Sequence, residues 1–220
     1  MKAVAPSWNR HARLRAADAH PIGTVVYLNG VAASGKSTLA RGLQVAWPTP
    51  WLHVGLDWLS GTMPDRFLGS GPEADLGARW VTGPDGRLLR VDPGPHGVRL
   101  LQGLPRLAAA LARAGNDVIV DNVLLYPWRT RDGAIALDGV PPHLVEVRCP
   151  LEIAQARARA RDGAAEIGMV DATYATTYAG DRYDLRIDTG TMEPEACVAR
   201  LAAYLRSGET PTAFAALRAG

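Results

Sequence analysis

The chain has 220 residues, 47% hydrophobic and 21% charged, with a formal net charge of +2. These values are ordinary for a globular protein, and the near balance of charges argues against a strongly basic nucleic-acid-binding surface. The length is sufficient for one compact domain with a substantial core.

Three sequence features indicate the cellular location of the protein: its cysteines, its apolar runs and its N-terminus. Cys149 and Cys197 have neither a C-x-x-C nor a Cys/His metal spacing, so we expect small core residues in a reducing, cytoplasmic setting. No apolar run approaches the roughly 20 residues of a membrane span. Residues 1–21 lack the apolar stretch of a signal peptide and are expected to form a leader before the first strand.

Strand and helix patterns alternate along the chain from residue 24. Short runs rich in Val, Ile and Leu predict buried strands at 24–28, 51–56, 118–120, 144–147 and 185–187. Helical spacing predicts helices at 37–47, 98–114, 151–161, 170–178 and 194–205. The alternation predicts an α/β fold in three layers, with a five-stranded parallel sheet covered on both faces. We expect the main domain at 22–206, and we assign no element to the C-terminal tail at 207–220.

The segment 60–97 is rich in Gly and Pro and lacks sustained periodicity. Pro84-Asp85-Gly86 is a turn signal and predicts a hairpin between 80–82 and 88–91. A long irregular segment inside a compact domain is usually functional. We expect it to form a cap over the substrate site, and we expect a lid helix at 151–169.

The strongest motif is Gly30-Val31-Ala32-Ala33-Ser34-Gly35-Lys36-Ser37, which matches G-x-x-x-x-G-K-[ST] between a predicted strand and a predicted helix. The glycines let backbone N–H groups face phosphates, and the helix N-terminus adds its positive end. Lys36 would contact the β- and γ-phosphates of ATP, and the Ser37 hydroxyl would bind Mg²⁺. The expected nucleotide-binding residues are Gly30, Ala33, Ser34, Gly35, Lys36, Ser37 and Thr38.

Other P-loop classes fit less well. The chain has no Asn-Lys-x-Asp guanine motif, and it carries Asp121-Asn122 where large motor-type ATPases carry Asp-Glu. A small kinase remains, and it needs a carboxylate to deprotonate the acceptor hydroxyl.

Two carboxylates are placed for that role. Asp57 and Asp121 follow the second and third predicted strands, and carboxyl ends of parallel strands border ligand sites. Either could be the base, while the other holds Mg²⁺ or its waters. Each could instead cap a helix.

Arginines and tryptophans complete the candidates. Arg157 and Arg161 share a helix face and are expected to stabilise the transferring phosphoryl group, whereas Arg159 points away. Trp58, Trp80 and Trp128 lie near candidate segments, where core packing is the more ordinary role for tryptophan.

Several segments together resemble the chloramphenicol phosphotransferases, in the same order from about residue 22 to about 206. They are the phosphate loop at 29–38, Gly55-Leu56-Asp57 with Met63-Pro64, 118–123, Val147-Arg148-Cys149, the arginines at 157–161, Gly168-Met169, and Tyr183-Asp184 before Asp188-Thr189. The cap at 65–97 matches poorly, and Asp121-Asn122 stands where the family has Asp-Asp.

The resemblance implies a P-loop kinase fold and transfer of the ATP γ-phosphoryl group to a hydroxyl of an antibiotic. It implies that Asp57 is the base and that Arg161, then Arg157, lies near the phosphates. Two alternatives stay open: a metabolic kinase of a sugar acid, shikimate-like compound or nucleoside, and a nucleotide-binding regulator without catalysis. The expected partner is a hydroxylated small molecule rather than nucleic acid or membrane, and self-association into a homo-oligomer is compatible with the sequence.

Overall fold

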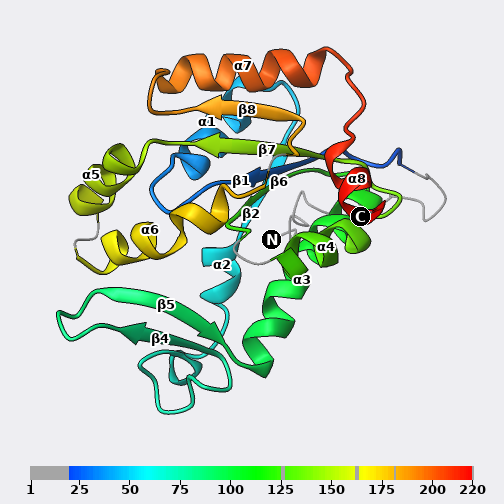
Figure 1. The fold of residues 1–220 in the computed structure, drawn as a ribbon. Helices are drawn as coiled ribbons and strands as arrows, with labels where there is room; N and C mark the ends of the chain where they lie inside the picture. The colour runs from blue at the N-terminus through cyan, green and yellow to red at the C-terminus, as the bar shows by residue number, and fades with distance from the viewer. Residues whose placement is uncertain (1–19, 125–126, 162–163, 181, 220) are drawn as a thin grey trace, which may run out of the picture.

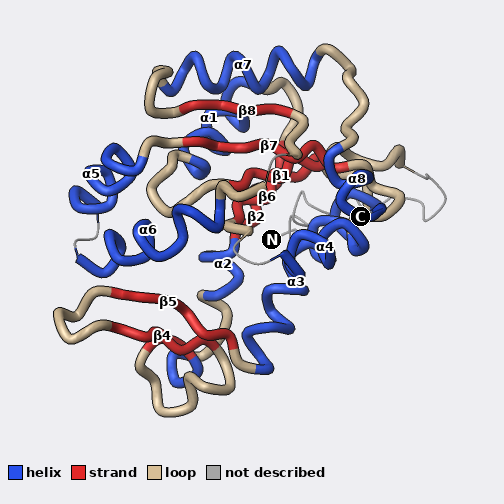
Figure 2. The backbone as a smooth tube through the Cα atoms, viewed as in Figure 1, coloured by secondary structure: helices blue, strands red, loops and turns tan. Residues whose placement is uncertain are grey.

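A computed structural model describes residues 20–124, 127–161, 164–180 and 182–219. These residues form a parallel sheet with helices on both faces and a smaller sheet set apart from it (Figures 1 and 2). Residues 1–19, nearly all of the predicted leader, lie outside the described part of the chain.

The large sheet confirms the predicted five-stranded parallel arrangement. Its strands pair in the order β2 (Trp51–Gly55), β6 (Asp117–Asn122), β1 (Val25–Asn29), β7 (Pro142–Arg148) and β8 (Leu185–Asp188). Every pairing is parallel. β1 is central and buried along its whole length, which explains why its run of apolar residues shows no polar alternation.

The two faces of the sheet are covered by different helices (Figure 1). On one face, α1 (Lys36–Ala46) and α7 (Pro194–Arg206) pack against Val26 and Leu28 of β1. On the other, α3 (Pro95–Arg113), α4 (Pro127–Ala136) and α8 (Ala213–Ala219) pack against Val25 and Tyr27. Successive strand residues point to opposite faces, so β1 contributes to both cores.

Two of these helices have no counterpart in the sequence analysis. α4 has no clear apolar stripe, and α8 lies in the stretch 207–220 to which no element was assigned. Phe214 of α8 is 3% exposed and packs edge-on against Tyr27, with ring centroids 5.4 Å apart. The end of the chain is therefore part of the core.

The segment 60–97, called the cap, begins at the last residue of the short helix α2 (Leu56–Ser60). It contains a 3₁₀ turn η2 (Asp65–Phe67) and the strands β3 (Leu68–Gly69), β4 (Ala78–Thr82) and β5 (Leu88–Pro93). β4 and β5 are antiparallel, and Gly83 donates a 2.8 Å hydrogen bond from its N–H to the Arg87 carbonyl across the turn. The predicted hairpin is confirmed.

The lid differs from the expected single helix at 151–169. It consists of α5 (Leu151–Arg161), which confirms the helix predicted at 151–161, and α6 (Ala164–Thr177), so the helix expected at 170–178 begins six residues earlier, at Ala164. The sequence Asp162-Gly163 between them is a helix-breaking signal, which the prediction of one continuous lid helix overlooked. α5 and α6 are called the lid helices below.

Both cysteines are unpaired and buried, as expected. Within the described residues, no helix combines the length and the apolar character needed to cross a bilayer.

Candidate active site

The phosphate loop joins β1 to α1 at the carboxyl edge of the sheet. Ala33 and Gly35 have positive φ values of 57° and 93°, which curl the backbone between strand and helix. A positive φ is uncommon for alanine, so the loop holds Ala33 in a conformation that glycine adopts more readily. Ser34 and Lys36 are buried within this curl.

Lys36 lies across the loop. Its Nζ donates to the carbonyls of Gly30 and Val31 at 2.9 and 2.8 Å, and lies 3.9 Å from Oδ1 of Asp121. Burial lowers the pKa of Lys36, while the charges of Asp121 and Asp57 act in the opposite direction. The lysine is thus held against backbone dipoles and one close carboxylate.

Asp121 is the acidic partner of the loop. Ser37 Oγ donates a 2.5 Å hydrogen bond to Asp121 Oδ2, joining the start of α1 to the end of β6. Burial opposes ionisation, but His53, Lys36 and Ser37 together hold the pKa of Asp121 below its usual value. An ionised carboxylate beside a serine hydroxyl is an oxygen donor set suited to Mg²⁺.

His53 was missed by the sequence analysis. It lies on β2 beside β6, and its Nε2 is 3.6 Å from Asp121 Oδ2, within ion-pair range but longer than a hydrogen bond. It also lines the cavity. No motif marks a lone histidine inside an apolar strand, and only strand pairing brings it to Asp121.

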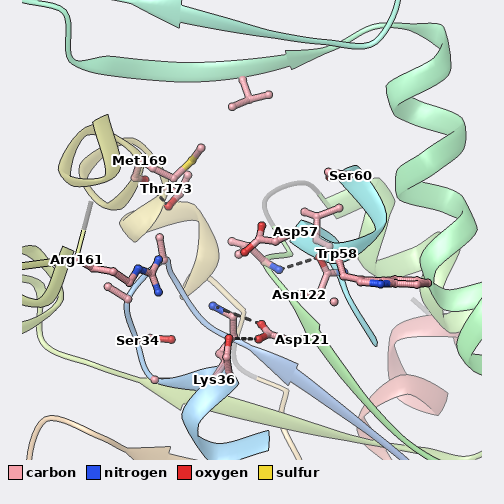
Figure 3. A pocket seen from close by; sticks show the side chains of 18 of the residues that line it. Ser34, Lys36, Asp57, Trp58, Ser60, Asp121, Asn122, Arg161, Met169 and Thr173 are labelled. Atoms are coloured by element: carbon pink, nitrogen blue, oxygen red, sulfur yellow. Dashed lines mark hydrogen bonds and ion pairs between the residues drawn. The ribbon is translucent and has the colours of Figure 1, made fainter. Parts of the chain in front are cut away.

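Asp57 lies two residues beyond the observed end of β2, whereas the sequence predicted it directly after the strand. β2 ends at Gly55, and Asp57 lies in the first turn of α2, where a carboxylate suits the helix dipole. Its side chain is exposed towards the cavity, on the same side as Lys36 and Asp121 (Figure 3). The structure thus brings together both carboxylates that the sequence singled out.

The lid arginines divide as the helical spacing predicted. Arg157 and Arg161 line the cavity, and Arg159 is absent from its lining. Arg157 donates to the Thr189 carbonyl at 2.8 Å and to its hydroxyl at 3.2 Å. Figure 3 shows Arg161 on the side of the phosphate loop opposite Asp57.

These groups open into one cavity of about 1020 Å³. Its floor is the phosphate loop, and its far wall is apolar. That wall draws on α2, α3, α6 and the cap, through Leu56, Trp58, Met63, Leu68, Trp80, Leu88, Val91, Leu100, Leu101 and Met169. Trp58 and Trp80 are 61% and 48% exposed, which is large for tryptophan, whereas Trp128 does not line the cavity.

A buried polar network explains why Asn122 stands beside Asp121. Asn122 is 2% exposed, donates to the Tyr27 hydroxyl at 2.6 Å and accepts a 2.7 Å hydrogen bond from Arg129. Arg129 also donates to the Val123 carbonyl at 2.7 Å. Asn122 therefore fixes the end of β6. Arg129 lines the cavity, and the sequence had not identified it as a site residue.

Comparisons with known proteins show which family this chain resembles in sequence. Residues 23–206 match the family described as "Chloramphenicol phosphotransferase-like protein". A Mycobacterium tuberculosis (strain H37Rv) protein named "Putative O-phosphotransferase" is 26% identical over 218 residues, covering 94% of this chain and 92% of that protein.

Solved structures share the fold at low sequence identity. The Mycobacterium tuberculosis APS kinase CysC, in complex with AMPPNP and APS, has a TM-score of 0.58 at 18% identity, covering 84% of this chain and 99% of that one. A sugar kinase from Janibacter sp. HTCC2649 also has a TM-score of 0.58, at 20% identity, with coverages of 84% and 95%. The fold is therefore that of P-loop kinases.

Proposed function

Because the chain belongs to the chloramphenicol phosphotransferase-like family and is thus a P-loop kinase, we propose that it uses ATP and Mg²⁺ to phosphorylate an antibiotic. The acceptor is a hydroxyl of a neutral, largely apolar small molecule such as chloramphenicol. One observation carries the proposal: a single cavity joins the phosphate loop, Asp57 and an apolar wall.

The nucleotide end of the cavity supports ATP binding. The phosphate loop and the N-terminus of α1 border the cavity, where backbone N–H groups and the helix dipole would bind phosphate, and Lys36 adds a cation. Ser37 and Asp121 would hold Mg²⁺, directly or through water. When bound, Mg²⁺ supplies charge neutralisation to the β- and γ-phosphates.

The transfer step assigns roles to residues of this chain. Asp57 accepts the proton of the acceptor hydroxyl as that oxygen forms a bond to the γ-phosphorus. The bond from the γ-phosphorus to the bridging oxygen breaks, and ADP leaves with the electron pair. Arg161, with Arg157 beside Thr189, stabilises the negative charge on the equatorial oxygens.

The apolar wall favours a neutral acceptor over a sugar acid or shikimate-like compound. An anionic substrate needs cations near its carboxylate or sulfate. Besides the two lid arginines and Arg41 of α1, the arginine that lines the described cavity is Arg129, which already donates to Asn122 and to the Val123 carbonyl. Exposed Trp58 and Trp80 instead offer flat apolar faces to an aromatic or aliphatic body.

The alternative of a regulator without catalysis is less well supported. A regulator would need only Lys36 and Ser37 to bind nucleotide. The same cavity also holds Asp57 and Asp121, which a transfer reaction would use and a regulator would not. The reducing, cytoplasmic location suggested by two unpaired cysteines stays part of this proposal.

The test is to incubate purified protein, ATP and Mg²⁺ with and without chloramphenicol and to measure product mass. A product heavier by one phosphoryl group, with matching ADP release, is the expected result. ATP binding without any adduct would reject chloramphenicol as the acceptor. Phosphoryl transfer to neutral hydroxylated antibiotics is then compared with transfer to anionic metabolites, and the comparison decides the acceptor class. Transfer to the anionic metabolites alone would overturn the proposal.

A further inference from the structure

In the part of the chain that the structure describes, the cap and the lid helices are in direct backbone contact, although no strand pairing joins them. Gly168 of α6 lies against Leu88, the first residue of β5, and a Cβ at Gly168 would be 2.5 Å from the Leu88 carbonyl oxygen and 2.6 Å from its nitrogen. Atoms of a real side chain do not approach so closely, so only glycine permits this packing. Figure 1 shows α6 lying between β5 and the large sheet.

An ion pair also joins the cap to α6. Arg87, which precedes β5, donates to Oδ2 of Asp171 at 2.9 Å, and Oδ1 of that carboxylate accepts a 2.5 Å hydrogen bond from Gln155. Gln155 belongs to α5, Asp171 to α6 and Arg87 to the cap. One carboxylate thus ties both lid helices to the hairpin.

The lid helices in turn pack on the phosphate loop. Val31 of that loop, Ala154 and Ala158 of α5, and Ile167 and Val170 of α6 form one buried apolar cluster. At the C-terminal end of α6, the Tyr178 hydroxyl donates to the Val147 carbonyl at 2.9 Å. A continuous path of packed groups therefore runs from β5 through α6 to the loop.

Each end of this path touches a different part of the cavity. Leu88 and Val91 of β5 belong to its apolar wall, and Arg157 and Arg161 of α5 border the phosphate loop. If β5 and the α5 arginines are rigidly connected, a ligand bound at the phosphate loop stabilises the ligand-bound conformation of the apolar wall. The reverse also holds, because such coupling is reciprocal.

We propose that Gly168, Arg87 and Asp171 are positioning residues that couple the acceptor-binding cap to the lid arginines. Nucleotide bound at Arg161 orders the cap hairpin through α6, and acceptor seated on the hairpin holds Arg161 over the phosphate loop. The inference rests on the proposed nucleotide site, but it does not depend on which acceptor is used.

Hydrogen exchange of the full chain with and without Mg²⁺ and AMPPNP tests the coupling without an acceptor. In the wild type, we expect AMPPNP to slow exchange both at residues 30–38 and at 88–93, the latter about fivefold or more. Arg87→Asp and Gly168→Ala should keep protection at 30–38 and reduce it at 88–93, roughly two- to fivefold for the exposed ion pair.

Two further variants sharpen the test. Arg87→Asp with Asp171→Arg restores an opposite-charge pair and should recover protection at 88–93. Arg66→Asp makes the same charge change within the cap, where Arg66 pairs with Glu73 at 3.2 Å and with none of the described side chains of α6, and should behave as wild type.

The outcomes separate the two proposals. Protection at 30–38 without protection at 88–93 in the wild type, or full protection at 88–93 in both Arg87→Asp and Gly168→Ala, would overturn the coupling and leave the kinase proposal intact. Absence of AMPPNP protection at 30–38 would refute nucleotide binding itself, and the coupling with it.

Discussion

The three arginines of α5 allow one prediction to be tested with its own controls. Arg157, Arg159 and Arg161 lie on one helix, yet only the first and third line the cavity. Burial lowers the pKa of Lys36 most, the charges of the two aspartates oppose that shift, and the charge of Arg161 adds to it, so Arg161 acts electrostatically at the phosphate loop. Each residue changed to alanine should therefore give a different result.

Arg161→Ala should lower kcat by about 10²–10³, which is about 2.7–4 kcal/mol of transition-state stabilisation, since one charged donor to the transferring group is removed. Arg157→Ala removes two hydrogen bonds to Thr189 from an exposed side chain, so we expect about 1–2 kcal/mol off the free energy of unfolding together with weaker nucleotide binding. Arg159→Ala should leave kcat and the free energy of unfolding unchanged.

The assay is ADP release at saturating nucleotide, followed by urea unfolding of each variant. A wild-type kcat for Arg161→Ala would refute its role in charge stabilisation. An equal loss for Arg159→Ala would show that the helix contributes general positive charge rather than a directed contact.

Three more predictions follow from particular contacts. Asp57→Asn should lower turnover by about 10²–10⁴ with nucleotide affinity unchanged by calorimetry, because only proton transfer is lost; wild-type turnover would reject Asp57 as the base. Burial lowers the pKa of His143, against the opposing charge of Asp184, so the unfolded chain binds a proton at higher pH than the folded chain. The free energy of unfolding should therefore fall as pH drops below about 6.5, and His143→Asn should weaken that pH dependence in urea titrations. The same pH dependence in wild type and variant would contradict this. Phe214→Ala should cost about 3–5 kcal/mol of unfolding free energy, because a buried ring against Tyr27 is removed; a loss below about 1 kcal/mol would show that α8 is dispensable.

Sequence reasoning succeeded where the signal is local. The phosphate loop is a contiguous motif, and the strands are contiguous apolar runs whose burial on both faces requires flanking helices. The turn at Pro84-Asp85-Gly86 likewise fixed the cap hairpin, and helical spacing alone separated Arg159 from Arg157 and Arg161.

The tertiary structure decided which distant residues share the site. Ser37 and Asp121 are 84 positions apart, as are Arg87 and Asp171, and both pairs meet only after strands and helices have packed. His53 and Arg129 carry no motif, and α8 lies within the segment 207–220, to which the sequence assigned no element. Sequence patterns record the periodicity of single elements, whereas a site is made by the register of parallel strands and the packing of helices between them, which no single segment contains.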